Sequence, residues 1–335
     1  MSFITISDPT LRDGNHSVNH QISLKMVAEY CRFAESAKIR IVEVGHGNGL
    51  GASSLLIGQM PHTDRQLLYT ARENLIDSQL GVHVIPGIAT IDRDISPAID
   101  IGVDVFRVGC HVTEANITQP HIEFIRNSGK TAVGVLMMTA LVDIKTLVSE
   151  AQKMEKYGVS DIIIMDSTGT YLPSDVSERI KALRNGLVVG VGFHAHNNLG
   201  MAVANSLAAA ESGATIIDAT MRGFGAGAGN TQLEVLIPVL EKSGFLTYVD
   251  FKRVIKEANT VMEYMIVKPP TVSPINILTG LNKLFSGFEK PIMKAASLYK
   301  VEYSELVRLL GERKLVAGQE DLIMEVAQNL SLRNK

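Results

Sequence analysis

The stretch Ile4-Thr-Ile-Ser-Asp-Pro-Thr-Leu-Arg-Asp-Gly-Asn-His16 decides how the rest of the chain is interpreted. It opens with a short apolar run, Ile4-Thr-Ile6, and continues with Arg12 and Asp13 instead of glycines. A doubly wound nucleotide-binding sheet normally places a Gly-rich turn directly after its first strand. The stretch therefore favours a parallel barrel whose first strand leads into a polar site, with the doubly wound sheet as the second choice.

Beyond this stretch, short β-rich apolar runs alternate with segments of helical period. Strands that alternate with helices predict parallel βαβ units, and eight strands in about 250 residues are typical of a (β/α)8 TIM barrel. The expected strands are 4–8, 39–44, 82–85, 105–108, 131–137, 161–165, 187–193 and 215–218. Clear helices are expected at 24–36, 64–76, 143–157, 175–183 and 201–212. Gly102, Gly158 and Gly213 stand where helices should end.

The alternation of strand-like and helix-like segments ends after about residue 260. Lys268-Pro-Pro-Thr-Val-Ser-Pro274 interrupts the periodicity, and no further strand follows it. The remainder is expected to form helices at 275–285, 291–299, 304–311 and 320–330. The prediction is a barrel domain over residues 1–260 and a small helical C-terminal domain over residues 261–335.

Composition excludes several classes of protein. The 335 residues are 46% hydrophobic and 20% charged, with a net charge of −3, which indicates a globular chain without a nucleic-acid footprint. No apolar run approaches the ~20 residues that span a bilayer, and no secretory leader is evident, so we expect a cytoplasmic protein without a membrane partner. Cys31 and Cys110 stand alone, which argues against a disulfide scaffold or a thiolate zinc site.

His194 and His196 follow the apolar run 187–191 and lie two positions apart. Residues two apart on an extended strand point to the same face, so both imidazoles can reach one ion. Together with Asp13 they would form a sulfur-free ligand set with open positions, which suits Mn²⁺ or Mg²⁺ better than zinc. The alternatives are an ordinary hydrogen-bonded histidine pair and an aspartate that caps a turn or pairs with Arg12.

Three further features near predicted strand ends each have two possible interpretations. His16 is either a surface histidine or a general base, because imidazole titrates near neutral pH. Ser167 either caps the next helix or binds a substrate carboxylate. The glycine-rich loop 223–230 either binds phosphate or packs close to the metal ligands.

Several motifs together resemble one family. They are Thr10-Leu-Arg-Asp-Gly14, Val44-Gly-His-Gly47, Thr113-Glu-Ala115, His194-Ala-His-Asn-Asn198, Gly225-Ala-Gly-Ala-Gly-Asn230 and the tail segment 312–322. The chain resembles the 4-hydroxy-2-oxovalerate aldolases, metal-dependent pyruvate aldolases related to hydroxymethylglutaryl-CoA lyase and isopropylmalate synthase. The tail is similar to the C-terminal module of the aldolases, which the CoA-linked relatives do not share.

The resemblance implies a mechanism. A divalent cation, usually Mn²⁺, would be held by Asp13, His194 and His196. The cation and Arg12 would stabilise the enolate of pyruvate, and His16 would move the proton of the C4 hydroxyl. Ser167, together with Arg12 and His194, would contact the bound 2-oxo acid. The family also implies an acylating acetaldehyde dehydrogenase as a partner that receives the aldehyde.

The sequence departs from the family pattern on the aldehyde side. Phe285 stands where the family has a tyrosine near the catalytic histidine, and a phenyl ring donates no hydrogen bond. Met137-Met-Thr-Ala140 replaces a Met-Met-Ser-His stretch, and Ile85 takes the place of a leucine that lines the aldehyde pocket. Two alternatives therefore stay open: a Claisen-type acyl-CoA lyase or condensing enzyme, and a non-catalytic partner of a dehydrogenase. The oligomeric state is not predicted.

Overall fold

The computed structural model describes residues 2–265, 269–315 and 318–333; Lys268 of the predicted break and residues 316–317 of the tail motif lie outside these ranges. Eight parallel strands close into a barrel in chain order, because the last strand pairs with the first. The strands are β1 (Thr5–Leu11), β2 (Ile41–Val44), β3 (Gln79–Val84), β4 (Val105–His111), β5 (Thr131–Met137), β6 (Asp161–Asp166), β7 (Gly190–Ala195) and β8 (Ile216–Asp218). The predicted (β/α)8 barrel is confirmed.

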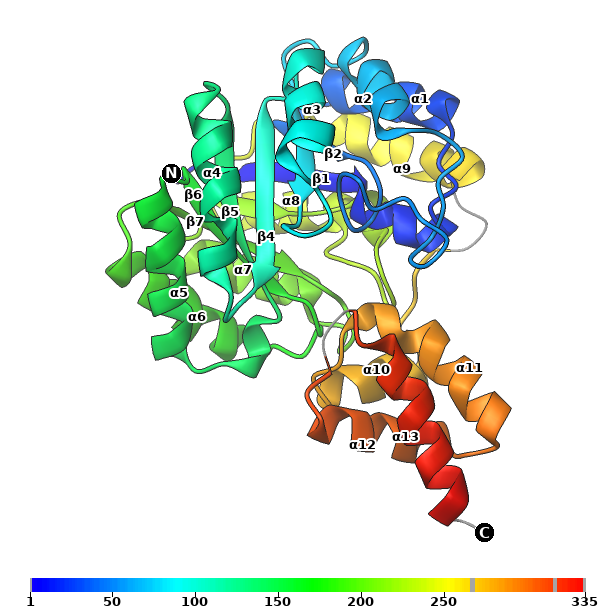
Figure 1. Ribbon diagram of the computed structural model, residues 1–335. Helices are drawn as coiled ribbons and strands as arrows, with labels where there is room; N and C mark the ends of the chain where they lie inside the picture. Colours follow the sequence, from blue (N-terminus) through cyan, green and yellow to red (C-terminus); the bar gives the residue numbers. More distant parts are fainter. Residues whose placement is uncertain (1, 266–268, 316–317, 334–335) are drawn as a thin grey trace.

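Helices cover the outside of the barrel and form the C-terminal region (Figure 1). Around the barrel lie α1 (Leu24–Ser36), α2 (Asp64–Arg72), α3 (Ser96–Ile101), α4 (Gln119–Asn127), α5 (Ile144–Tyr157), α6 (Pro173–Gly186), α7 (Ala202–Glu211), α8 (Leu233–Lys242) and α9 (Phe251–Met265). The C-terminal region contains α10 (Pro274–Leu281), α11 (Glu289–Tyr299), α12 (Tyr303–Glu312) and α13 (Glu320–Arg333).

Local signals set several helix ends as expected. The side chain of Asp143 accepts a hydrogen bond from the Thr146 amide at 2.8 Å and starts α5. Gly158 ends the same helix at φ 100°, a left-handed conformation that glycine adopts without strain. Gly102 ends α3 in the same way, at φ 101°.

Several predicted boundaries differ from the structure, among them those of the helix expected over 64–76, which ends at Arg72, and of the strand expected over 82–85, which spans Gln79–Val84. Two further differences follow apolar runs. The seventh strand starts at Gly190 and not at Leu187, since α6 runs to Gly186 and Val188 in the connection is 93% exposed. The helix expected over 275–285 ends at Leu281, because Lys283 takes a left-handed φ of 54°. Phe285 consequently lies in a loop and not in a helix.

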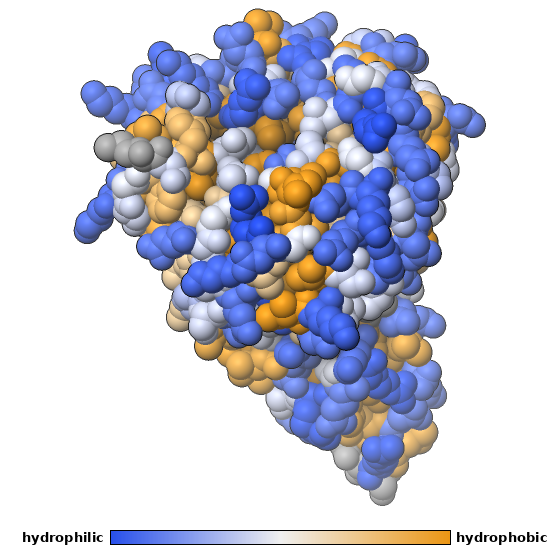
Figure 2. Space-filling model, turned by 90° about the vertical axis from the view of Figure 1, so that its left-hand side faces the viewer, coloured by the Kyte–Doolittle hydropathy of each residue, from blue (hydrophilic) through white to orange (hydrophobic). Residues whose placement is uncertain are grey.

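The C-terminal helices lie beyond the carboxyl ends of the barrel strands. The arrow of β4 points toward them in Figure 1, and Figure 2 shows them tapering away below the wider barrel. Their own apolar core includes Leu284, Phe288, Ile292, Leu306, Leu310 and Ile323. Ser286 bonds across to the barrel, with its hydroxyl donating to the Ser167 carbonyl at 3.1 Å and to Asn198 Oδ1 at 2.9 Å. Among the described residues, we find no helix with the length and apolarity needed to cross a membrane.

Candidate active site

Asp13, His194 and His196 meet at the carboxyl end of the barrel. Asp13 lies two residues beyond β1, His194 lies in β7, and His196 lies one residue beyond that strand. One ligand atom from each of the three buried side chains lies within 4.8 Å of the others, so they can share a single cation. The sequence therefore identified the three residues that the barrel brings together.

The hydrogen bonds of the two imidazoles fit a metal site. Nδ1 of His194 donates to Oδ2 of Asp218 at 2.8 Å, which leaves Nε2 as the bare nitrogen. Nε2 of His194 and Nδ1 of His196 are buried and have no hydrogen-bond partner among the described residues. Buried polar atoms normally have partners, and a divalent cation would satisfy both.

A chain of buried ion pairs connects Asp13 to His194 beneath this group. Arg12 donates to Asp13 at 2.9 Å and to Glu43 at 3.0 Å, and Arg107 contacts Glu43 and bonds Asp218 at 2.6 Å. Asp218 in turn holds His194. Three carboxylates face two guanidinium groups, so one negative charge is uncompensated, which favours a bound cation.

The electrostatic environment keeps Asp13 and His196 in the protonation states that metal binding requires. Burial opposes ionisation of Asp13, but Arg12 and the nearby imidazoles hold its pKa well below its usual range. Burial lowers the pKa of His196 to about 3, so its imidazole is neutral near pH 7. Asp218, next to Arg107, also has a lowered pKa despite its burial.

His16 lies near this group, on the wall of a cavity of about 550 Å³ between the barrel and the C-terminal helices. Its ring packs against Gly47, where an added Cβ would lie 2.3 Å from Nε2 of His16. His20 contacts the ring edge-on at a centroid distance of 4.8 Å, and His46 stacks on His20 at 3.7 Å. Burial lowers the pKa of His16, so the ring is neutral near pH 7 and has an unprotonated nitrogen that can act as a base.

Phe285 lines the same cavity as His16, and its ring packs edge-on against Phe288 at 5.5 Å. The phenyl ring therefore faces the same cavity as the imidazole of His16. Lys290 also lines this cavity, and its ammonium contacts Asn19.

Ser167 follows β6 and is buried beside β7, since Asp166 pairs with Ala195 in the sheet register. Its hydroxyl oxygen accepts the Met138 amide at 2.9 Å, so the hydroxyl hydrogen is available to a ligand. No described contact joins Ser167 to Asp13, His194 or His196. The role of Ser167 stays a prediction.

The glycine-rich loop packs against the ligand group. Nδ2 of Asn230 donates to Asp13 at 2.6 Å, and a Cβ at Gly225 would lie 2.5 Å from the same side-chain nitrogen. A Cβ at Gly227 would lie 2.8 Å from the carbonyl oxygen of Ser286. Amides of the loop, at Gly225, Gly229 and Asn230, already donate to protein oxygens. The contacts favour close packing over phosphate binding.

Sequence reasoning missed three buried residues of this region: Asp218, Asn230 and His83. Asp218 and Asn230 were visible only as the end of a strand and the end of a glycine run.

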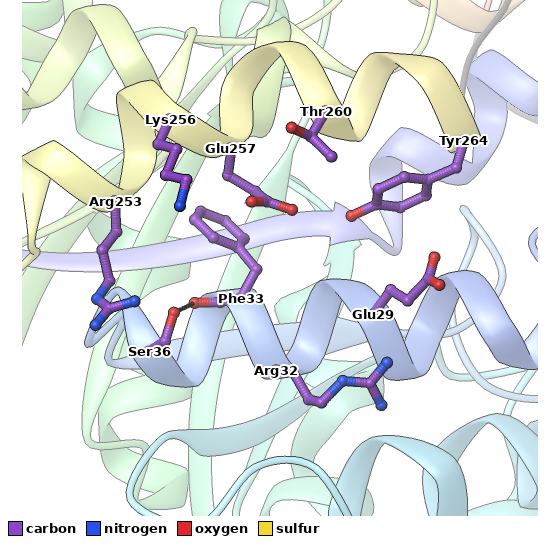
Figure 3. Close-up of a pocket in the computed structure, with 9 residues that line it drawn as sticks. All are labelled: Glu29, Arg32, Phe33, Ser36, Arg253, Lys256, Glu257, Thr260 and Tyr264. Carbon is purple, nitrogen blue, oxygen red and sulfur yellow. Dashed lines mark hydrogen bonds between the residues drawn. The ribbon is translucent and has the colours of Figure 1, made fainter.

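A hollow of about 420 Å³ between α1 and α9 contains none of the predicted site residues. Figure 3 shows that helix side chains such as Arg32 and Glu257 line it.

Comparison with known proteins agrees with this geometry. The HMGL-like family model matches residues 3–261, and the DmpG-like communication domain matches residues 270–332. Fold and site thus define a (β/α)8 enzyme of the HMGL-like class. The 4-hydroxy-2-oxovalerate aldolase of Pectobacterium atrosepticum is 53% identical, over 99% of this chain and 97% of that protein. The 4-hydroxy-2-oxovalerate aldolase of Spirochaeta aurantia is also 53% identical, over 98% of this chain and 97% of that protein.

The chain belongs to the 4-hydroxy-2-oxovalerate aldolase family. This confirms the predicted family and the predicted class of enzyme, a carbon–carbon lyase. Among solved structures, the carboxyl transferase domain of Rhizobium etli pyruvate carboxylase superposes with a TM-score of 0.81 at 17% identity. The match covers 99% of this chain and 61% of that one. It supports the fold alone.

Proposed function

We propose that the protein cleaves a 4-hydroxy-2-oxo acid, such as 4-hydroxy-2-oxopentanoate, to pyruvate and a short aldehyde. The convergence of Asp13, His194 and His196 beside the buried guanidinium of Arg12 carries the proposal. When bound, a divalent cation, for which we propose Mn²⁺ with Mg²⁺ as a substitute, supplies the Lewis acid for the keto and carboxylate oxygens.

Three side chains have separate roles in the reaction. His16 takes the proton of the C4 hydroxyl, the C3–C4 bond breaks, and its electrons pass into the enolate of pyruvate as the aldehyde forms. Nη2 of Arg12 is buried and has no partner among the described residues, so it can donate to the developing enolate oxygen. The Ser167 hydroxyl donates to the substrate carboxylate.

The test is release of pyruvate from 4-hydroxy-2-oxopentanoate by the chelator-treated protein before and after addition of Mn²⁺. We expect turnover only with the metal, and a loss of turnover of about 10²–10⁴-fold in the His16→Ala variant. Thiol release from acyl-CoA substrates without turnover of the 4-hydroxy-2-oxo acid would instead support the Claisen-type alternative.

We further propose that residues 270–332 bind an acylating aldehyde dehydrogenase, because a DmpG-like communication domain matches these residues and the family resemblance implies such a partner. Co-expression and co-purification with such an enzyme tests this. A complex without any turnover would favour the non-catalytic alternative. The boundary between residues 260 and 261 and a cytoplasmic location stay predictions.

A further inference from the structure

His83 is a buried imidazole that no step of the proposed reaction uses. It lies in β3, is 2% exposed, and its Nδ1 has no hydrogen-bond partner among the described residues. Val82 and Val84 pack in the core between strands and helices, so the alternation along the strand turns His83 into the barrel. A buried imidazole nitrogen without a protein partner is available to hydrogen-bond a ligand.

The surroundings of His83 fix its backbone and leave a defined space for its ring. The amide of Leu50 donates to its carbonyl at 2.9 Å, and the sheet register pairs it with Arg107. The ring fills the space above Gly109, where an added Cβ would lie 2.7 Å from Cε1 of His83. Gly109 is therefore required for the imidazole to lie in the barrel mouth.

His83 is a neutral hydrogen-bonding group next to the reaction site. Its burial, together with the charges of Arg12 and Arg107, keeps its pKa well below the usual value. A neutral imidazole offers one donor and one acceptor. His83 does not belong to the group that can share a cation, which contains only Asp13 and two histidines of the β7 region among the described residues.

The position of His83 around the barrel indicates which part of the substrate it meets. Ser167, proposed for the carboxylate, follows β6, three strands away from β3. His16, proposed for the C4 hydroxyl, packs on Gly47 just after β2, the neighbour of β3. A substrate that spans from Ser167 to His16 therefore places the groups beyond C4 on the side of His83.

We propose that His83 is a specificity-determining residue that hydrogen-bonds a hydroxyl group carried by the aldehyde half of the substrate. This inference rests on the proposed aldolase function. It predicts that the protein prefers a hydroxylated aldehyde to an alkyl aldehyde of equal size, because a site built around a polar contact rejects the analogue that lacks it.

The test compares glycolaldehyde with propanal, which have the same number of heavy atoms, in condensation with pyruvate. In the wild type we expect kcat/KM to favour glycolaldehyde at least tenfold. His83→Leu, which fills the same space without polar atoms, should reduce this ratio at least tenfold, and His83→Asn should retain part of it. An unchanged ratio in His83→Leu would overturn the proposal.

Two control measurements separate this role from the reaction itself. Exchange of pyruvate methyl protons with solvent and the affinity for Mn²⁺ should be the same in the wild type and in His83→Leu. Loss of exchange in the variant would place His83 at the pyruvate half and contradict the proposal. Absence of exchange in the wild type would overturn the aldolase function and this role together, whereas exchange with an unchanged aldehyde ratio would overturn the role of His83 alone.

Discussion

Nδ1 of His194 lies 2.8 Å from Oδ2 of Asp218, the same carboxylate oxygen that Nη2 of Arg107 holds at 2.6 Å. The carboxylate fixes the tautomer of the imidazole and leaves Nε2 bare toward the position that a cation would share with Asp13. Such outer partners orient metal-binding histidines and increase their basicity. The buried ion pair between Arg107 and Asp218 thereby helps to orient His194 for metal binding.

Replacement of Asp218 by Asn should weaken metal binding. Asp218→Asn keeps the size of the side chain but removes the charge that orients His194, so the affinity for Mn²⁺ should fall about 10–100-fold. Calorimetric titration of the metal-stripped protein measures the change. The exposed Asp100→Asn serves as the control. Equal affinities in wild type and Asp218→Asn would contradict this role.

Gly47→Ala should impair the proton transfer without affecting the metal site. The new Cβ would lie 2.3 Å from Nε2 of His16 and would displace the ring. We expect kcat for cleavage to fall about 10²-fold or more, with unchanged affinity for Mn²⁺. Asn48→Ala, one residue along the same loop, should change kcat little. If Gly47→Ala keeps full activity, His16 is not the general base.

Phe285→Tyr tests the departure from the family pattern. Phe285 lines the cavity beside His16, so a tyrosine hydroxyl at this position could donate to the reacting oxygen or relay a proton. We expect kcat for retro-aldol cleavage to rise several-fold while the affinity for Mn²⁺ stays the same. A rate that is unchanged or lower would indicate that His16 acts without help from this position.

Asp8 should give the protein a distinct dependence of stability on pH. It accepts the Thr10 amide at 2.9 Å, and burial raises its pKa from 3.8 to about 6. The folded state thus binds this proton more tightly than the unfolded state does, so its contribution is complete below pH 4 and is lost as the pH rises through 6.

Asp8→Asn removes the contribution of Asp8 to the pH dependence of stability. The histidines contribute equally in both proteins, so their effect cancels in the comparison. The free energy of unfolding of Asp8→Asn relative to wild type should therefore increase between pH 4 and pH 7, by about 3 kcal/mol. Urea unfolding of the metal-free proteins at several pH values provides the measurement. A difference that does not vary with pH would show that Asp8 is ionised throughout.

The sequence was sufficient for the barrel because each βα unit carries its own local signals. Leu24–Ser36 was predicted with its observed bounds, and glycines such as Gly158 mark helix ends through backbone conformation alone. The run Leu187-Val-Val189 failed as a strand because apolar content does not distinguish a strand from an exposed connection; Val188 is 93% exposed.

The candidate ligands could be predicted because polar residues at the carboxyl ends of barrel strands face one mouth. The residues that hydrogen-bond these candidate ligands could not be predicted from the sequence. Asn230 bonds Asp13 across 217 positions, and Asp218 reaches His194 from the neighbouring strand, so neither contact has a local pattern. The inward direction of His83 also depends on the register of β3 and on the space above Gly109, which only the closed barrel reveals.

The central claim is that one divalent cation shared by Asp13, His194 and His196 makes the methyl group of pyruvate acidic. The most direct test follows the exchange of pyruvate methyl protons with D₂O by mass spectrometry, in the metal-stripped protein, after addition of Mn²⁺, and in Asp13→Asn. We predict exchange only in the wild type with Mn²⁺. Exchange that proceeds without metal, or that survives in Asp13→Asn, would contradict the account.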